Sequence, residues 1–235
     1  MPAPPAHEPF KPLPRSLLLL VGAIALIELL LSAADAGLIA DPTLRTRVLE
    51  AGAFWSPLLR GAVPAFALQP ATMFVSHALL HGSFLHMAMN MAVLLALGRF
   101  VGDRYGGRTI LPVFLIGAVA GGAVFGLLSA SAVPMVGASG AVFAFLGVWT
   151  IWDLRRHRAA GVPAGPVWRR VLVLIGLNIV LYFGLGGMLA WQAHLGGFLA
   201  GIGCGLWLEN RRDAQTMRLR AAARRAAAGS GPPTD

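Results

Sequence analysis

Three long stretches of this sequence contain no Asp, Glu, Lys or Arg: Gly61–Gly98, Ile110–Trp152 and Val171–Leu208. A helix needs about 20 predominantly apolar residues to cross a bilayer. The second and third stretches are each long enough for two crossings. Each is also interrupted by small or turn-forming residues, near Ser129–Pro134 and at Gly184–Gly187 respectively, so each is expected to form two spans. The pattern therefore predicts an all-α, polytopic membrane protein.

The composition excludes the main alternatives to a membrane protein. Residues of the AVILMFWYC set make up 57% of the chain and charged residues only 12%, whereas soluble domains average roughly 25% charge. Disordered chains need low hydrophobicity and high net charge, which also excludes that class. The single cysteine, Cys204, excludes a disulfide framework and a cysteine-based zinc or iron–sulfur site.

The number of crossings follows from the basic residues, which tend to stay on the cytoplasmic side of a membrane. Ser16–Leu38 forms a first span, and Gly61–Gly98 is long enough for one crossing or two. With one crossing the total is six, and only Arg45, Arg47 and Arg60 of the 19 Lys and Arg residues lie outside; with two, only Lys11 and Arg15 remain inside. We therefore predict six transmembrane helices with both termini in the cytoplasm.

The same assignment divides the chain. We expect a cytoplasmic segment at 1–15, a membrane domain at 16–208 with an external loop at about 39–70, and a basic, partly disordered cytoplasmic tail at 209–235. The external loop is too apolar to be free in water, so we expect it to lie partly in the membrane interface. The net charge of +9 is explained by topology, and no basic stripe is interleaved with aromatics, so nucleic acid is not expected as a partner.

A few polar residues fall inside the predicted spans, where they are costly and are functional candidates by default. They are Glu28, His77, His81, His86, Asn90 and His194, together with Ser139. The second, fourth and sixth spans all enter from outside and carry, near their starts, all of these residues except Glu28, which lies in the first span. At 1.5 Å per residue, Ser139 and His194 should both lie about 7–10 Å below the outer surface.

The surroundings of Ser139 and His194 allow two interpretations each. Gly137-Ala138-Ser139-Gly140 fits either a contact between small residues of two helices or a nucleophile whose flanking N–H groups face an anion. His194 precedes the small residues Gly197 and Gly201, which let two helices approach closely. From spacing alone, His194 fits a general base and a histidine bonded to a backbone carbonyl equally well.

Three motifs together resemble those of the rhomboid family of intramembrane serine proteases, in its bacterial six-span form. They are Gly137-Ala138-Ser139-Gly140, Ala193-His194-Leu195-Gly196-Gly197, and the segment from His81 to Met91 that carries His86 and Asn90. The match covers about residues 55–208. It implies a rhomboid-like bundle in which Ser139 is the nucleophile and His194 its general base.

The resemblance also implies roles for residues around this pair. His86 and Asn90 would help the Ser139 N–H to bind the oxyanion, and His81 would support the site. The other supporting residues expected are Gly137, Gly140, Gly197, Gly201 and Phe143, where the family usually has tyrosine. Phe143 fits a ring that stacks on His194 or ordinary packing, and His77 has no assigned role.

Two positions depart from the family pattern. Many relatives carry Trp-Arg where this chain has Thr72-Met73, and a frequent Glu is replaced by Gly102, followed by Asp103. These departures put the geometry of the external loop and substrate access in doubt, but not the chemistry.

The sequence therefore predicts a serine endopeptidase of the cell membrane, in bacteria the inner membrane, that cuts single-span membrane proteins near the outer face. No carboxylate falls at the depth of His194, which favours a Ser–His dyad over a triad, and no metal or cofactor is expected. Two alternatives remain open: a non-catalytic rhomboid-like protein that binds clients, and a haem or metal protein with ligands from His81, His86 and His194. A metalloprotease is disfavoured because no HExxH motif is present.

Overall fold

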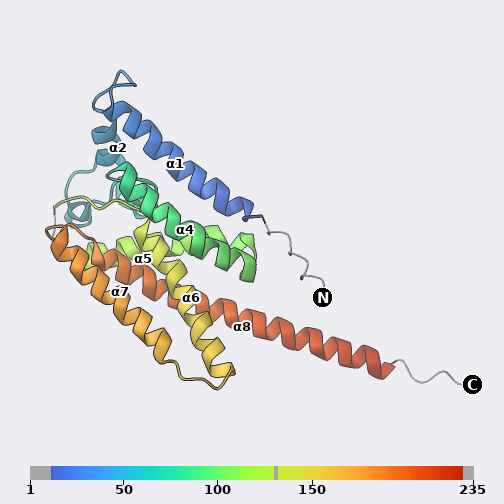
Figure 1. Ribbon diagram of the computed structural model, residues 1–235. Helices are drawn as coiled ribbons and strands as arrows, with labels where there is room; N and C mark the ends of the chain where they lie inside the picture. Colours follow the sequence, from blue (N-terminus) through green and yellow to red (C-terminus); the bar gives the residue numbers. More distant parts are fainter. Residues whose placement is uncertain (1–11, 130–131, 230–235) are drawn as a thin grey trace, which may run out of the picture.

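Six long helices contain most of the residues that this computed structural model describes, which are 12–129 and 132–229 (Figure 1). They are α1 (Arg15–Asp35), α4 (Phe84–Tyr105), α5 (Ile110–Leu128), α6 (Ser139–Ala159), α7 (Gly165–Gly184) and α8 (Trp191–Gly229). The described residues form no strand beyond one isolated antiparallel bridge, which confirms the all-α prediction. Residues 1–11 with Lys11, residues 130–131 in the expected break, and residues 230–235 of the expected tail lie outside the described part.

Within the described part of the chain, four helices are long and apolar enough to cross a membrane: α1, α4, α5 with the preceding η3 (Gly107–Thr109), and α7. The other two, α6 and α8, are more polar and share the most extensive interface in the bundle. Helix α6 also packs against α4 and α5, so protein rather than lipid covers much of its surface. A helix enclosed in this way needs less apolar surface, which explains why the two helices that carry Ser139 and His194 are the more polar ones.

The main core lies where α1, α4, α5 and α6 meet, around the fully buried side chains of Leu17, Leu94, Phe114 and Phe145. Helix α7 stands apart from this core, since Val167 is its one buried residue among those described. Its polar links to the rest of the bundle include an ion pair from Arg170 to Asp153 of α6, at 2.5 Å.

The segment between α1 and α4, called the external segment after its expected location, is folded onto the bundle. It consists of α2 (Leu44–Gly52), η1 (Ser56–Arg60), α3 (Gln69–Ser76) and η2 (His77–Leu79). Phe54 is fully buried, with its ring edge-on to Phe74 and Phe125. Its backbone exchanges two hydrogen bonds with Met135, of 2.9 and 3.0 Å, and so joins the segment to the loop before α6.

Arg45 anchors this segment to α1. Its guanidinium donates to Glu28 at 2.9 Å, to Asp35 at 2.6 Å and to the backbone carbonyl of His81 at 2.9 Å. The hydrogen bond to Glu28, followed by that to Asp35, raises the pKa of Arg45 above its ordinary value. Glu28, singled out in the sequence as a functional candidate, is thus the buried half of an ion pair.

Each of the two departures from the family pattern includes a packing position. Met73 is fully buried in the cluster around Phe54. Gly102 faces Pro14 so closely that a Cβ there would lie 2.4 Å from the Pro14 Cγ.

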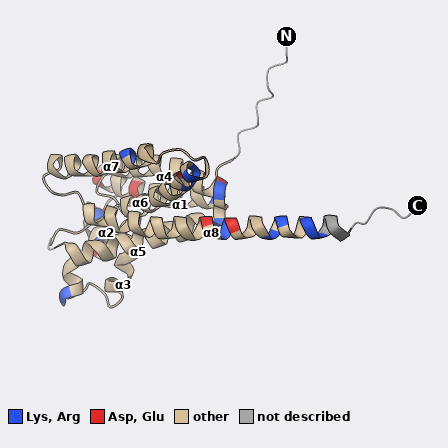
Figure 2. Ribbon diagram, turned by 90° about the horizontal axis from the view of Figure 1, so that it is seen from below, with Lys and Arg blue, Asp and Glu red and all other residues tan. Residues whose placement is uncertain are grey.

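Helix α8 runs without interruption from Trp191 through the predicted tail to Gly229. Its last third projects beyond the other helices and carries Arg218, Arg220, Arg224 and Arg225 (Figure 2).

Two expected positions differ from those observed. His81 lies before α4 rather than within the span, because Ser83 is in extended conformation and its hydroxyl caps the helix by accepting from the His86 N–H. Ser139 is the first residue of α6 rather than one turn inside it, because the chain from Val133 to Ala138 is not helical.

Candidate functional site

Ser139 and His194 are in direct contact at one end of the bundle. Ser139 begins α6, His194 lies in the first turn of α8, and the Ser139 Oγ is 2.8 Å from the His194 Nε2. His194 is 8% exposed. The pair therefore has the geometry of a nucleophile and a general base, which requires about 2.6–3.2 Å between heavy atoms.

The contact between α6 and α8 depends on glycines. A Cβ added to Gly197 would lie 1.8 Å from the Gly140 carbonyl oxygen, and one added to Gly201 would lie 2.1 Å from that of Ala144. The two backbones thus touch with no side chain between them, as expected from the spacing of these glycines. This approach brings the histidine on α8 within reach of the serine on α6.

The second ring nitrogen of His194 is also bonded. Its Nδ1 lies 2.5 Å from the Oδ1 of Asn178, which extends from α7. The Asn178 Nδ2 donates to the Leu174 carbonyl at 2.9 Å, so its Oδ1 faces the histidine as an acceptor. Nδ1 is then the protonated nitrogen, which leaves the Nε2 lone pair for the Ser139 hydroxyl.

Phe143, one turn after Ser139, covers a face of the His194 ring. The two rings are stacked, with centroids 4.4 Å apart and planes 5° from parallel. Of the two interpretations of Phe143, the geometry is that of the stacking partner. Phe143 thus holds the plane of the His194 ring by stacking, and Asn178 holds the rotation of the ring by its hydrogen bond to Nδ1.

Asn178 is the residue that the sequence interpretation missed. A signal was present, because Asn178 is a polar amide within the charge-free stretch Val171–Leu208. Its distance of 16 residues from His194 gave no reason to pair the two.

The loop before Ser139 is held by two histidines. The Gly137 N–H donates to the backbone carbonyl of His77 at 2.9 Å, and the Ala138 N–H donates to the His81 Nε2 at 3.3 Å. Gly137 has φ of +125°, and a Cβ there would lie 2.8 Å from the His86 ring. Only glycine fits this backbone at this distance.

His86 and Asn90 lie one turn apart on α4, and the His86 ring packs beside Gly137 and edge-on to His81, with centroids 5.0 Å apart. The Asn90 amide donates to the His86 carbonyl at 2.9 Å, which leaves its second amide hydrogen free of a partner among the described residues. The N–H groups of the first turn of α6 have no intrahelical acceptor. Potential donors therefore flank Ser139 from both α4 and α6.

The histidines do not form a cluster of metal ligands. No group of three His, Cys, Asp or Glu side chains suited to a metal ion occurs in residues 12–129 and 132–229. Both nitrogens of His194 are bonded, to Ser139 and Asn178, and the His81 Nε2 accepts from Ala138.

Comparison with known proteins places this arrangement in a family. Residues 69–211, which include every residue of the site described above, match the family model of the rhomboid domain. The chain belongs to the rhomboid family. As a rhomboid with four described helices that are long and apolar enough to cross a membrane, it is a multi-pass membrane protein.

Curated relatives agree with this assignment. The rhomboid protease GlpG of Yersinia pestis (strain Pestoides F) is 32% identical over 147 residues, which cover 62% of this chain and 50% of that protein. The rhomboid protease GlpG of Photorhabdus laumondii is 33% identical over 140 residues, or 59% of this chain and 47% of that protein. This rhomboid chain spans about half the length of the curated relatives it matches.

Proposed function

We propose that this protein is an intramembrane serine endopeptidase that hydrolyses peptide bonds in the transmembrane segments of other membrane proteins. The observation that carries the proposal is the 2.8 Å contact between the Ser139 Oγ and the His194 Nε2 at the ends of two closely packed helices. The names of the matching relatives, rhomboid protease GlpG, support it.

Ser139 acts as the nucleophile. As its Oγ bonds to the carbonyl carbon of the scissile peptide, its proton passes to the His194 Nε2, which then gives that proton to the departing amine. Water, deprotonated by the same nitrogen, then hydrolyses the ester to Ser139 and regenerates the enzyme. The proton transfers thus balance within one serine and one histidine.

Asn178 is a positioning residue in this scheme. It accepts from Nδ1–H of His194 and keeps Nε2 free to take the serine proton. In the described residues no carboxylate bonds to His194, and the amide takes the place that an aspartate has in serine-protease triads, as asparagine does in papain-like proteases.

The oxyanion of the tetrahedral intermediate would form beside the first turn of α6. The Ser139 N–H, the His86 ring and the Asn90 amide are the donors proposed for it. His81 and His77 act indirectly, because they hold the loop that positions the serine.

The proposed substrates are single-span membrane proteins cut near the outer face of a bacterial inner membrane, with both termini of this chain in the cytoplasm. The dyad lies at the N-terminal ends of α6 and α8, and the arginines gather at the opposite ends of these helices, which positive-inside topology places in the cytoplasm. Helical peptide bonds are protected by their own hydrogen bonds, so the cut segment should contain helix-weakening Gly or Pro.

The test uses purified full-length protein in detergent with a model single-span substrate and a serine-reactive fluorescent phosphonate. We expect cleavage and labelling by the wild type, and loss of both in Ser139→Ala and His194→Ala variants that remain monodisperse. Cleavage by either variant at the wild-type rate would overturn the assignment. Substrate binding by the wild type without cleavage or labelling would instead favour the client-binding alternative, and activity lost with chelators would favour a metal protein.

A further inference from the structure

A groove of about 600 Å³ runs between α5 and α8, away from the serine and histidine. Its walls are apolar or small: Pro112, Val113 and Ile116 of α5, and Ala200, Gly203 and Cys204 of α8. A Cβ added to Gly203 would meet no atom within 4 Å, so the groove is open along this glycine. One end of the groove is formed by Arg108 and Arg211.

A second cavity, of about 860 Å³, continues from that end. The two share Thr109, Trp207, Leu208 and Arg211. The second cavity adds Arg104, Arg212 and Arg218, and neither lining contains an Asp or Glu. The apolar groove is thus continuous with a second cavity that is lined by basic residues.

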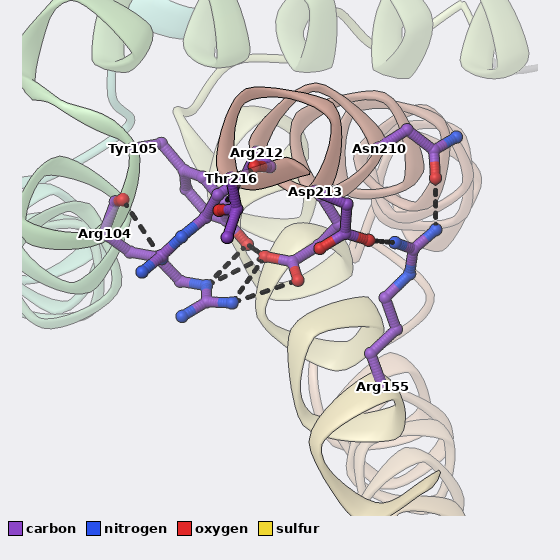
Figure 3. Close-up of polar contacts among 8 residues, drawn as sticks. Arg104, Tyr105, Arg155, Asn210, Arg212, Asp213 and Thr216 are labelled. Carbon is purple, nitrogen blue, oxygen red and sulfur yellow. Dashed lines mark hydrogen bonds and ion pairs between the residues drawn. The ribbon is translucent and has the colours of Figure 1, made fainter. Parts of the chain in front are cut away.

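The nearby carboxylates are already neutralised (Figure 3). Glu209 accepts two hydrogen bonds from Arg104, of 2.8 and 3.0 Å, and a third from the Tyr105 hydroxyl. Asp213 accepts from Arg155 at 3.0 Å. These bonds point the two carboxylates at other partners, so they do not offset the charge of the remaining arginines.

Four of those arginines make no ion pair within the described residues: Arg108, Arg211, Arg212 and Arg218. The Arg211 guanidinium lies over the Trp207 ring, 4.7 Å from its centroid. A cation stacked on an aromatic ring keeps its charge and its hydrogen-bond donors available to an anion.

The length of the groove matches one leaflet of a bilayer. From Ala200 to Arg211, α8 rises about 16 Å, which is about half of the roughly 30 Å hydrocarbon core. The apolar walls then lie at the depth of acyl chains and the arginines at the depth of headgroups. An occupant of this site must combine an apolar chain with an anionic head.

We propose that the groove and the adjoining cavity form a binding site for an anionic phospholipid. One acyl chain lies between α5 and α8, and the phosphate is bound by Arg211 and Arg108, with Arg212 and Arg218 beside it. Along α8, Arg211 is about 25 Å from His194, so the site is separate from the proposed protease site.

Native mass spectrometry of the full-length protein in detergent tests this site. With added phosphatidylglycerol we expect a retained 1:1 complex, and with phosphatidylcholine at the same concentration at least tenfold less. The double variant Arg108→Gln/Arg211→Gln should lower phosphatidylglycerol retention at least tenfold. The matched control, Arg224→Gln/Arg225→Gln, removes the same charge from the far end of α8 and should retain the lipid. An equal loss of phosphatidylglycerol retention in both double variants would show that the lipid is held only by the general attraction of a basic helix, and would overturn the proposal.

A second variant tests the acyl groove without changing charge. Gly203→Leu places a side chain in the open part of the groove and should displace the lipid, while the thermal unfolding temperature of the protein stays close to that of the wild type. Unchanged retention in this variant, or displacement of the lipid by millimolar glycerol phosphate, would show a headgroup-only anion site and contradict the proposal. A dimer that dissociates in Gly203→Leu would assign the groove to a second copy of the chain and also contradict it.

Discussion

The Oδ1 of Asn178 lies 2.5 Å from the Nδ1 of His194, whose Nε2 lies 2.8 Å from the Oγ of Ser139. These three side chains come from α7, α8 and α6, and α7 buries little else against the bundle. The hydrogen bond that Asn178 accepts from His194 is therefore a main link between α7 and the proposed site. Its loss should alter the chemistry of His194 more than the stability of the fold.

Asn178→Leu removes the acceptor while keeping a side chain of similar size. A hydrogen bond of this kind contributes about 0.5–1.5 kcal/mol, so we expect kcat to fall about twofold to tenfold with little change in KM. The rate of phosphonate labelling at Ser139 should fall in parallel. Both follow from a His194 ring whose tautomer and rotation are no longer fixed.

Two further variants separate positioning from structure. Asn178→Asp keeps an acceptor at this position and should restore much of the rate. Val180→Ala, also on α7 but 66% exposed, should leave kcat unchanged. If Asn178→Leu raised KM alone, or if Asn178→Asp gave no rescue, Asn178 would not position the base.

Phe143→Ala should slow the reaction because the His194 ring loses its stacking partner. Such ring pairs contribute about 0.5–1.5 kcal/mol beyond the area they bury, so we expect a roughly twofold to tenfold drop in kcat. Phe143→Tyr keeps the ring and should stay close to wild type. Full activity in Phe143→Ala would contradict this role and would show that Phe143 contributes only ordinary packing.

Gly197→Val tests the close approach of α6 and α8. The added Cβ would lie 1.8 Å from the backbone oxygen of Gly140, and no side-chain rotation relieves that contact. The helices must separate, and because a 1 Å misplacement can cost about a hundredfold in rate, we expect cleavage to fall by at least that factor. The measurement is kcat/KM for protein that elutes as one species.

Gly22→Val is the matched control for this change, because a Cβ on Gly22 of α1 would have no atom within 4 Å. It should cleave at close to the wild-type rate. Full activity in Gly197→Val would mean that Ser139 and His194 do not depend on this backbone contact.

Arg45→Met breaks a buried ion pair and leaves the Glu28 carboxylate, 1% exposed, without its charge partner. Removing one member of a buried pair costs about 3–5 kcal/mol, so the melting temperature in detergent should drop clearly. Arg47→Met, also on α2, breaks the exposed pair with Asp41 and should have little effect. Equal melting temperatures in the two variants would contradict the anchoring role of Arg45.

Much of the architecture can be predicted from the sequence, because charge-free stretches and the spacing of glycines are properties of single, continuous segments of the chain. The stretches located the long helices, and the spacing of Gly197 and Gly201 predicted which face of α8 meets α6. The depth argument brought Ser139 and His194 together, although Ser139 proved to be a helix start. The prediction of a contact between Ser139 and His194 holds because the N-terminal ends of α6 and α8 lie side by side.

The residues that the sequence did not reveal act across large separations. Asn178 is a lone amide on a helix of apolar neighbours, and Arg45 enters the topology prediction only as an external charge. Arg45 bonds to Glu28, Asp35 and the His81 carbonyl, partners at separations of 17, 10 and 36 residues. No periodicity links such positions, so their pairing depends on the tertiary fold.

The bridge between Phe54 and Met135 separates the external segment into parts that differ in their tolerance of inserted sequence. Phe54 and Met73 are fully buried, so extra residues beside them would shift the loop that carries Ser139. Between these anchors the chain turns outward, and Val63 is 91% exposed. An epitope or fluorophore tag placed after Val63 would therefore mark the face of the bundle that is expected to lie outside, without disturbing the proposed active site.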